Sequence, residues 1–159
     1  MDVFEVALLN RLRGQWRTTA ENGGGRCPCC DRWGRVYKRN INETMARSLI
    51  WLCGAPAENG WVNVPAHAPR WLIRTNQLPT LRYWDLVQRA SAMGSDKKHP
   101  GLWRPTQLGR VFARDEVSMP KTVYTYNDQR EKYGDEVIRI SECFGSHFSY
   151  KELMGGLDG

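Results

Sequence analysis

Apolar residues recur in the middle of the chain at a spacing that predicts a helix with one buried face. Thr75 or Asn76 can cap its start, and Pro79 then falls in the first turn, where a missing N–H group costs little. Residues 74–77 are therefore expected to form the N-terminus of this helix. The apolar positions that define the pattern are Leu78, Leu81, Trp84 (or Leu86) and Val87.

A basic turn and a short strand follow where the helical pattern stops at Gly94. Residues 97–101 read Lys-Lys-His-Pro-Gly, which is typical of an exposed turn. Residues 102–104 alternate as a strand, and Thr106 is placed to cap a further helix. The residues of that helix expected to face inward are Leu108, Val111 and Phe112.

The first part of the chain predicts two helices separated by a loop and a strand. Residues 1–16 form an amphipathic helix whose apolar side either packs into the core or serves as a dimer arm. Residues 18–26 contain Glu-Asn-Gly-Gly-Gly and predict a loop. Residues 33–39 predict a strand whose basic side chains lie either along phosphate or in solvent. A second helix begins after a cap at Asn40 or Asn42.

A β-hairpin and short helices are predicted for the last part of the chain. Residues 121–126 alternate β-branched and aromatic residues, which predicts a strand. This strand is expected to turn at residues 127–129 and to pair with residues 137–140. Ser141 can cap a short helix, and a capping box predicts another helix after Ser149.

The composition favours one domain with an anionic partner. A chain of 159 residues with 41% hydrophobic residues can bury an ordinary core. The net charge is +6, and residues 1–120 carry eighteen Lys or Arg against ten Asp or Glu. No run of about eighteen apolar residues is present. Asp2 and Glu5 argue against a secretory signal, so neither export nor a membrane partner is expected.

The cysteines are arranged for a metal or for free thiols rather than for a disulfide framework. Their number is five, and Cys27, Cys29 and Cys30 lie within four positions. Cys27 and Cys30 have the spacing of half a zinc site, with Cys29 as an alternative thiolate. A complete site needs four ligands, and the sequence has no second Cys-x-x-Cys motif. The candidate partners, of which the two cysteines also read as buried apolar residues, are Cys53, His67, Cys143 and His147.

The common enzyme motifs are missing from the sequence. Residues 23–25 are three glycines, but they lack the flanking strand and the Lys-Ser/Thr of a P-loop. Neither Gly-x-Ser-x-Gly nor His-Glu-x-x-His occurs. A catalytic Cys–His pair forms in space and leaves no motif, but nothing in the sequence points to one. Recognition is therefore expected rather than catalysis, and the chain is not expected to be an enzyme.

Two resemblances can be named. The segment LWRPTQLGRVF at residues 102–112 resembles the wing return of MarR-like and PadR-like winged-helix regulators, where an aromatic closes the wing and Thr starts the next helix. The chain also resembles a family of small phage-encoded proteins with a Cys-Pro-x-Cys knuckle, over most of residues 27–154. This second resemblance implies a phage protein in the cytoplasm of a bacterial host, but it gives no reaction. The segments that carry it are CPCCDRWGRVYKRNINETMARSLIWL, RTNQLPTLRYWDLV, DKKHPGLWRPTQLGRVF, PKTVYTYND and FSYKELM.

The first resemblance implies an α+β fold with a winged-helix core in a single domain. We expect an N-terminal helix and loop over residues 1–26 and a cysteine turn and strand over 27–40. The winged-helix core is expected over 41–116, and a hairpin with a C-terminal helix over 117–159. The connection of residues 54–70 departs from the regulators, because it is long for the turn of a helix-turn-helix.

In a winged helix, the first residues of the recognition helix meet base edges in the major groove. On this pattern Arg74 is expected to read guanine, while Asn76 and Gln77 read adenine. The chain is then a regulator that binds double-stranded DNA, with a homodimer as an option. The other DNA contacts, at the tip of the wing and along the phosphate backbone, are expected from Lys97, Lys98, His99, Arg82 and Arg104.

The alternative interpretation is a phage inhibitor that binds and blocks a host protein without catalysis. A defence nuclease or the transcription machinery would be such a target, since one fold serves many functions. Exposed Trp residues or the acidic tail would serve this role better than the basic turn. The acidic residues of the tail are Asp128, Glu131, Asp135 and Glu136.

Overall fold

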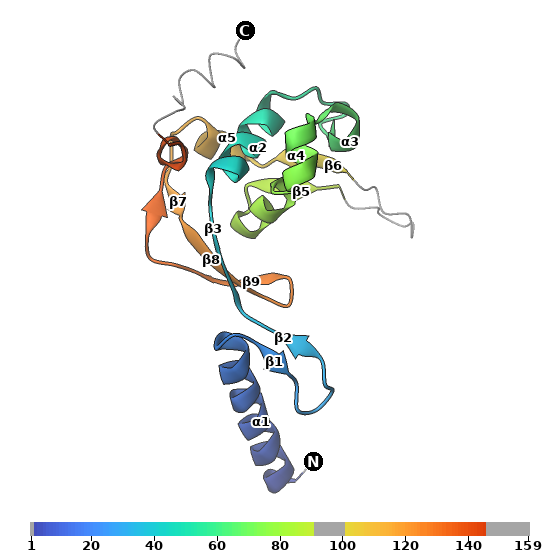
Figure 1. The fold of residues 1–159 in the computed structure, drawn as a ribbon, viewed down its shortest axis with the longest axis vertical. Helices are drawn as coiled ribbons and strands as arrows, with labels where there is room; N and C mark the ends of the chain where they lie inside the picture. Colours follow the sequence, from blue (N-terminus) through green and yellow to red (C-terminus); the bar gives the residue numbers. More distant parts are fainter. Residues whose placement is uncertain (1, 91–100, 146–159) are drawn as a thin grey trace. The chain divides into compact units, whose positions relative to one another are not determined.

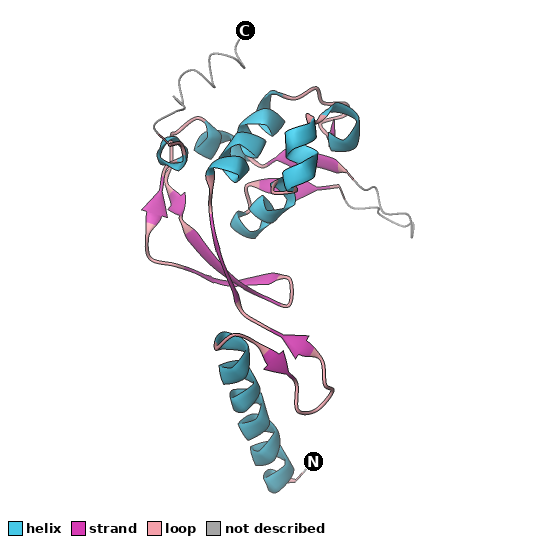
Figure 2. Cartoon of the chain, viewed as in Figure 1, coloured by secondary structure: helices cyan, strands magenta, loops and turns pink. Residues whose placement is uncertain are grey.

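The computed structural model describes residues 2–90 and 101–145, which form two compact units (Figure 1). Unit 1 consists of Met1–Arg39 and Val123–Tyr133, and unit 2 consists of Asn40–Thr122 and Gly134–Gly159. Helices and small antiparallel sheets occur together (Figure 2), so the predicted α+β class is confirmed. The expectation of a single domain stays a prediction.

Unit 1 begins with its one long helix, α1 (Val3–Glu21), which is started by a capping box. The N–H of Glu5 donates to the Asp2 side chain at 2.9 Å, and the N–H of Asp2 donates to the Glu5 carboxylate at 3.0 Å. The predicted helix is confirmed and extends to Glu21. The other elements of unit 1 are β1 (Gly25–Arg26), β2 (Trp33–Gly34), β3 (Tyr37–Asn40), β8 (Thr122–Tyr126) and β9 (Gln129–Tyr133), of which the last three form a sheet in the order β3-β8-β9.

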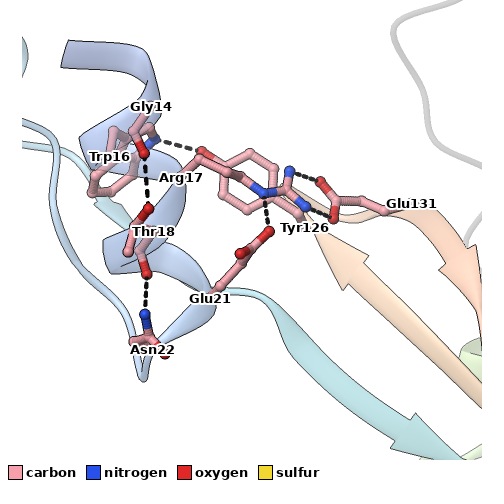
Figure 3. Close-up of polar contacts among 8 residues, drawn as sticks. All are labelled: Gly14, Trp16, Arg17, Thr18, Glu21, Asn22, Tyr126 and Glu131. Atoms are coloured by element: carbon pink, nitrogen blue, oxygen red, sulfur yellow. Dashed lines mark hydrogen bonds and ion pairs between the residues drawn. The ribbon is translucent and has the colours of Figure 1, made fainter. Parts of the chain in front are cut away.

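Polar contacts join the second half of α1 to the hairpin of β8 and β9 (Figure 3). Trp16 donates from Nε1 to Tyr126 Oη at 2.8 Å, and both terminal nitrogens of Arg17 donate to the Glu131 carboxylate. Arg17 Nε also donates to Glu21 at 2.6 Å. The hydrogen bonds to Glu131 and then Glu21 raise the pKa of Arg17. Bidentate arginine–carboxylate pairs fix geometry well, so this end of α1 is held on the hairpin.

Unit 2 is arranged around the helix α2 (Glu43–Gly54). Its predicted cap is confirmed, because Asn42 Oδ1 accepts the N–H of Met45 at 2.9 Å. The other elements in chain order are β4 (Val62–Asn63), α3 (Val64–His67), α4 (Arg70–Thr75), the 3-10 helix η1 (Leu78–Trp84), β5 (Val87–Arg89), β6 (Leu102–Pro105), α5 (Gln107–Ala113), β7 (Met119–Pro120), β10 (Val137–Ile138) and the 3-10 helix η2 (Ile140–Cys143).

The core of unit 2 lies where α2 meets η1, α5 and a three-stranded sheet. The sheet is antiparallel in the order β4-β6-β5, with Trp103 of β6 opposite Val62 and Arg89. Trp84 and Phe112 are fully buried, and Trp84 Nε1 donates to the backbone oxygen of Pro120 at 2.7 Å. The indole N–H of Trp84, which is the only polar group of this side chain, therefore has a hydrogen-bond partner within the core.

The predicted helix from Arg74 toward Met93 is wrong. Asn76 ends α4 with φ 49°, η1 covers only Leu78–Trp84, and Asp85 with φ 58° redirects the chain into β5. The physical reason lies in the spacing, because residues 78, 81 and 84 are three apart and all three are buried. A 3-10 helix has 3.0 residues per turn and places such residues on one face.

The predicted pairing of residues 121–126 with 137–140 is also wrong. Asn127 and Asp128 both have positive φ, at 49° and 62°, and form a two-residue turn. Such a turn pairs the residues directly on either side of it, so β8 pairs with β9. The strand β10 instead pairs with β7.

The structure confirms some of the smaller expectations and corrects others. Thr106 caps α5 as predicted, and Phe112 is buried, but Leu108 is 36% exposed rather than inward. The strand expected over 33–39 is split into β2 and β3, which join different sheets. The helix expected after Ser149 lies outside the described residues. Within the described ranges, none of the helices has the length and apolar content of a membrane span.

Candidate functional site

The helix α4 presents two exposed arginines. Arg70 is its first residue and Arg74 lies in its last turn, while Leu72 between them is buried and anchors the helix in unit 2. The guanidinium groups of Arg70 and Arg74 make no hydrogen bond, ion pair or ring contact with any residue in the described part of the chain. Both guanidinium groups are therefore available to an anionic partner.

The expectation that residues 74–77 begin a helix is wrong. Arg74 lies at the C-terminal end of α4, where its charge complements the helix dipole. Asn76 is the left-handed C-cap, and Gln77 donates from Nε2 to the Thr75 oxygen at 3.3 Å. Gln77 then precedes η1 without capping it. The roles of Arg74, Asn76 and Gln77 at DNA bases stay predictions.

Arg82 is held close to the surface of η1. It donates from Nη1 to the Pro79 oxygen at 2.9 Å and from Nη2 to Tyr83 Oη at 3.0 Å. Its guanidinium carbon also lies 4.5 Å from the centre of the Tyr83 ring. Arg82 is therefore a half-exposed arginine whose orientation is fixed by contacts within η1.

The outer face of the β4-β6-β5 sheet carries an ordered row of Trp61, Arg104 and Gln88. The guanidinium carbon of Arg104 lies 4.2 Å from the centre of the Trp61 ring. Arg104 also donates from Nε and Nη2 to Gln88 Oε1, at 3.0 and 2.9 Å. Stacking and two hydrogen bonds fix this arginine in a half-exposed position, so it is preorganised for contact.

The expected basic tip lies between β5 and β6, which are the two arms of a hairpin. Lys97, Lys98 and His99 lie outside the described residues, so their placement is untested. On the arms, Arg89 lies with its guanidinium carbon 6.0 Å from the centre of the Trp103 ring. The strand predicted for residues 102–104 is confirmed and continues to Pro105.

Three of the residues described above escape the sequence analysis, namely Arg70, Trp61 and Arg89. Arg70 follows Pro69 in a stretch that reads as a long loop, so its place on a helix is hidden. Trp61 lies in an isolated bridge with Glu58 just before the two-residue strand β4, and Arg89 ends the three-residue strand β5; such elements are too short for periodicity to detect. The Pro69 at the start of α4 is the one signal that could have located Arg70.

A second candidate site is the cysteine turn of unit 1. The hairpin of β1 and β2 is closed by the N–H of Cys27 donating to the Arg32 oxygen at 2.8 Å, and by the N–H of Asp31 donating to the Cys27 oxygen at 2.8 Å. Cys29 and Cys30 are exposed at the turn. Their backbone N–H groups donate to Cys27 Sγ, and these hydrogen bonds lower the pKa of Cys27. A thiol prepared in this way fits the thiolate form that zinc requires.

The remaining candidate ligands do not complete a site in the described structure. No group of three or more His, Cys, Asp or Glu side chains in residues 2–90 and 101–145 is arranged to hold a metal ion. Cys53 and Cys143 belong to unit 2, and burial raises the pKa of each to about 11. His67 is exposed at the end of α3, and His147 lies outside the described residues.

Comparison with known proteins adds no assignment to either candidate site. No protein-family model, no curated protein and no solved structure matches the chain. The function therefore has to be argued from the two sites themselves.

Proposed function

We propose that unit 2 binds double-stranded DNA as a winged-helix module of a phage-encoded transcriptional regulator. The observation that carries the proposal is the connection of its elements. A helix, α2, is followed by the edge strand β4, by the short helices α3, α4 and η1, and by the β5–β6 hairpin, whose second strand returns to pair with β4. Helices followed by a sheet in the order β4-β6-β5, with a basic segment between the last two strands in sequence, support this proposal, because the resemblance to winged-helix regulators implies such an arrangement.

The charge of this region supports an anionic partner. Residues 61–113 contain eight Lys or Arg and two Asp, which concentrates positive charge on the elements of the proposed module. Arg70 and Arg74 are exposed and unpaired within the described residues, and Arg104 is fixed against Trp61. The unpaired arginines give up no existing contact when they bind phosphate, and the fixed arginine loses little side-chain freedom.

The short helices indicate how such a module would contact DNA. A recognition helix of several turns reads bases with side chains along one face. The helix η1 has seven residues of 3-10 geometry, so it offers fewer base-facing positions. We therefore infer that phosphate contacts from α4, η1 and the hairpin supply most of the affinity, with modest sequence preference.

The test is duplex binding as a function of salt. Fluorescence anisotropy with a labelled duplex of random sequence would measure affinity across a salt series. If Arg70 and Arg74 each contact one phosphate, the double variant Arg70→Gln with Arg74→Gln weakens binding by roughly tenfold or more. The slope of log affinity against log salt then becomes shallower by about two.

A matched control separates local contacts from net charge. Arg11 and Arg13 are exposed on α1, and replacing both with Gln lowers the net charge by the same amount. This control should show the same slope of log affinity against log salt as the native chain. Equal losses in both double variants, or duplex binding that does not weaken as salt rises, would contradict the proposal.

A second candidate function is supported by the apolar residues of the same helix. Trp71 and Ile73 of α4 are 38% and 52% exposed, beside the two free arginines. Exposed aromatic and aliphatic side chains next to arginine are typical of protein interfaces. These residues favour the alternative function, an inhibitor that binds a host protein. The resemblance to phage proteins implies that such an inhibitor acts in a bacterial cytoplasm.

The two candidate functions predict opposite results for one double variant. Replacing Trp71 and Ile73 with Ala should leave salt-dependent duplex binding within about threefold of the native chain if DNA is the partner. An inhibitor would instead lose capture of its target from a nuclease-treated host lysate with these changes, and would show no affinity for duplex.

A further inference from the structure

The cysteine turn of unit 1 carries two thiols at the spacing of half a zinc site. Cys27 is tied into the β1–β2 hairpin by its backbone, while Cys30 follows at the i+3 position on the exposed turn. Asp31 has φ 60°, which bends the chain back toward β2. Two sulfur atoms at this spacing on a stiff turn can occupy one edge of a tetrahedron around Zn²⁺.

Two thiolates are half of what a structural zinc site needs. Such sites are closed by four protein ligands, commonly four cysteines. In residues 2–90 and 101–145, no three possible ligands are arranged to hold a metal ion. Of the three remaining cysteines, Cys29 is exposed on the same turn, and Cys53 and Cys143 are half-buried in unit 2, where Cys143 Sγ donates to the Arg139 oxygen at 3.7 Å. The missing pair of ligands therefore has to come from a source outside this arrangement.

The helix α1 beside this turn has an apolar ridge that is covered along only part of its length. The ridge follows every fourth residue, and its C-terminal part is covered by unit 1 itself: Ala20 is fully buried, and Trp16 lies against Gly34. Its N-terminal part is open, with Phe4 at 86% and Leu8 at 52% exposure. Figure 1 shows the β1–β2 hairpin running back alongside α1. The residues of the ridge, in order, are Phe4, Leu8, Leu12, Trp16 and Ala20.

We propose that two copies of this chain share one zinc ion, with Cys27 and Cys30 of each copy as the four ligands, and that the open ends of the two α1 ridges pack together. A second copy supplies the same pair of thiols again, so one two-fold axis through the metal completes the set. The four thiols release four protons to solvent as the metal binds, and no redox step is involved.

A second copy explains both features at once. An apolar ridge on an amphipathic helix is expected to be buried against something, and the ridge of an identical helix has the same spacing. Burial of the side chains of Phe4 and Leu8 adds to the metal bonds, because each exposed apolar side chain gains when it leaves water. The proposal is independent of DNA binding, since it concerns unit 1 alone.

The experiment measures mass and metal content on the full chain. The protein is purified with a phosphine reductant, which excludes disulfide dimers, and is analysed by light scattering and by elemental analysis. We expect a dimer with one zinc for every two chains. A strong chelator should convert it to monomer, and added Zn²⁺ should restore the dimer.

Variants identify the ligands and the packing surface. Cys27→Ser and Cys30→Ser should each lose zinc and give monomer, while Cys143→Ser should keep both dimer and metal. Phe4→Glu with Leu8→Glu should weaken dimer association by roughly a hundredfold without unfolding the chain, because both side chains are exposed in the monomer. Cobalt substituted for zinc should give the visible spectrum of a tetrahedral tetrathiolate complex.

The outcomes that overturn the proposal are equally specific. A monomer with one zinc per chain would place all ligands in one copy, and a cobalt spectrum with nitrogen ligands would point to a histidine. A chain that takes up no zinc from supplemented medium, or a dimer that persists in Cys27→Ser, would exclude a shared metal.

Discussion

Gly109 is a residue at which the absence of a side chain decides the packing of unit 2. A Cβ atom at this position would lie 2.0 Å from the backbone oxygen of Leu86. The N–H of Gly109 donates to Thr106 Oγ1 at 2.9 Å, and Thr106 Oγ1 donates to the Asp85 oxygen at 2.6 Å. The first turn of α5 thus lies directly on the link between η1 and β5, where only glycine fits.

The same substitution is expected to have opposite effects at two glycines. Gly109→Ala should lower the free energy of unfolding by about 1–3 kcal/mol, because backbone atoms that cannot rotate away must move. Gly14→Ala, in the open middle of α1, should raise it by up to about 1 kcal/mol through helix propensity. Urea denaturation of each variant measures both changes. A neutral Gly109→Ala would show that α5 is loosely packed.

Helix caps at single residues were predicted in part. The caps at Asn42 and Thr106 are found, because a cap depends on a side chain and a backbone N–H group three residues apart, whereas Asn76 ends α4 and does not begin a helix. Asp85 has a left-handed conformation that nothing in its sequence neighbourhood requires. That conformation follows from the packing of Leu86 into the core, which is not local information.

At the scale of elements, Thr106 joins three parts of unit 2 through one hydroxyl group. It caps α5, and by donating to Asp85 it connects α5 to the end of η1 and the start of β5. The hairpin that follows from β5 is the proposed wing. The orientation of the hairpin relative to the helices therefore depends on this contact.

Thr106→Val should remove both hydrogen bonds while keeping the shape of the side chain. We expect the free energy of unfolding to fall by about 1–2 kcal/mol, since a cap is lost and the Asp85 oxygen loses its donor. Thr106→Ser keeps both hydrogen bonds and should retain most of the stability. Thermal and urea unfolding compare the three chains, and equal stability of the Val and Ser variants would show that the hydroxyl is unimportant.

Elements with little periodicity limited the prediction of the fold. The apolar residues at 78, 81 and 84 fit a spacing of three as well as 3.6, and a pattern of so few positions cannot separate an α-helix from a 3-10 helix. The two-residue strand β4 and the four-residue helix α3 lie inside the segment that predicts a long connection. Elements this short are stabilised by their neighbours in space, so their own sequence carries a weak signal.

At the scale of the whole molecule, the main feature is that unit 1 is built from two separate segments. Residues up to Arg39 provide α1, the cysteine hairpin and most of β3, and Val123–Tyr133 provides the hairpin of β8 and β9. The contacts of Trp16 with Tyr126 and of Arg17 with Glu131 join the two segments. Neither segment alone has all three strands of the β3-β8-β9 sheet.

Two shortened chains should therefore behave differently. A chain that begins at residue 40 keeps the β8–β9 hairpin but loses its partner strand β3, so an edge of the sheet becomes exposed. We expect this chain to associate and precipitate. A chain that also replaces residues 123–133 with a Gly-Ser linker should remain a folded monomer. Size-exclusion chromatography and circular dichroism distinguish them, and equal solubility would contradict the assignment of the hairpin to unit 1.

The candidate sites were only partly predictable from the sequence, because they also depend on contacts between distant parts of the chain. The sequence locates Cys27, Cys30, Arg74 and Arg104 by residue type and spacing. It does not show that Arg104 is held by Trp61 and Gln88, since these lie on three different strands or turns. Ligands from a second copy leave no trace in the spacing of one chain.

The division of unit 1 between two distant stretches of sequence also restricts how such a gene can change. Recombination that transfers only the N-terminal coding segment would deliver α1, the cysteine hairpin and β3 without the β8–β9 hairpin that β3 pairs with, and the recipient would carry unsatisfied backbone groups. Viable exchange has to replace both stretches together. Length changes are accordingly expected to accumulate at the turns of the molecule and not at the crossings near Arg39, Thr122 and Tyr133.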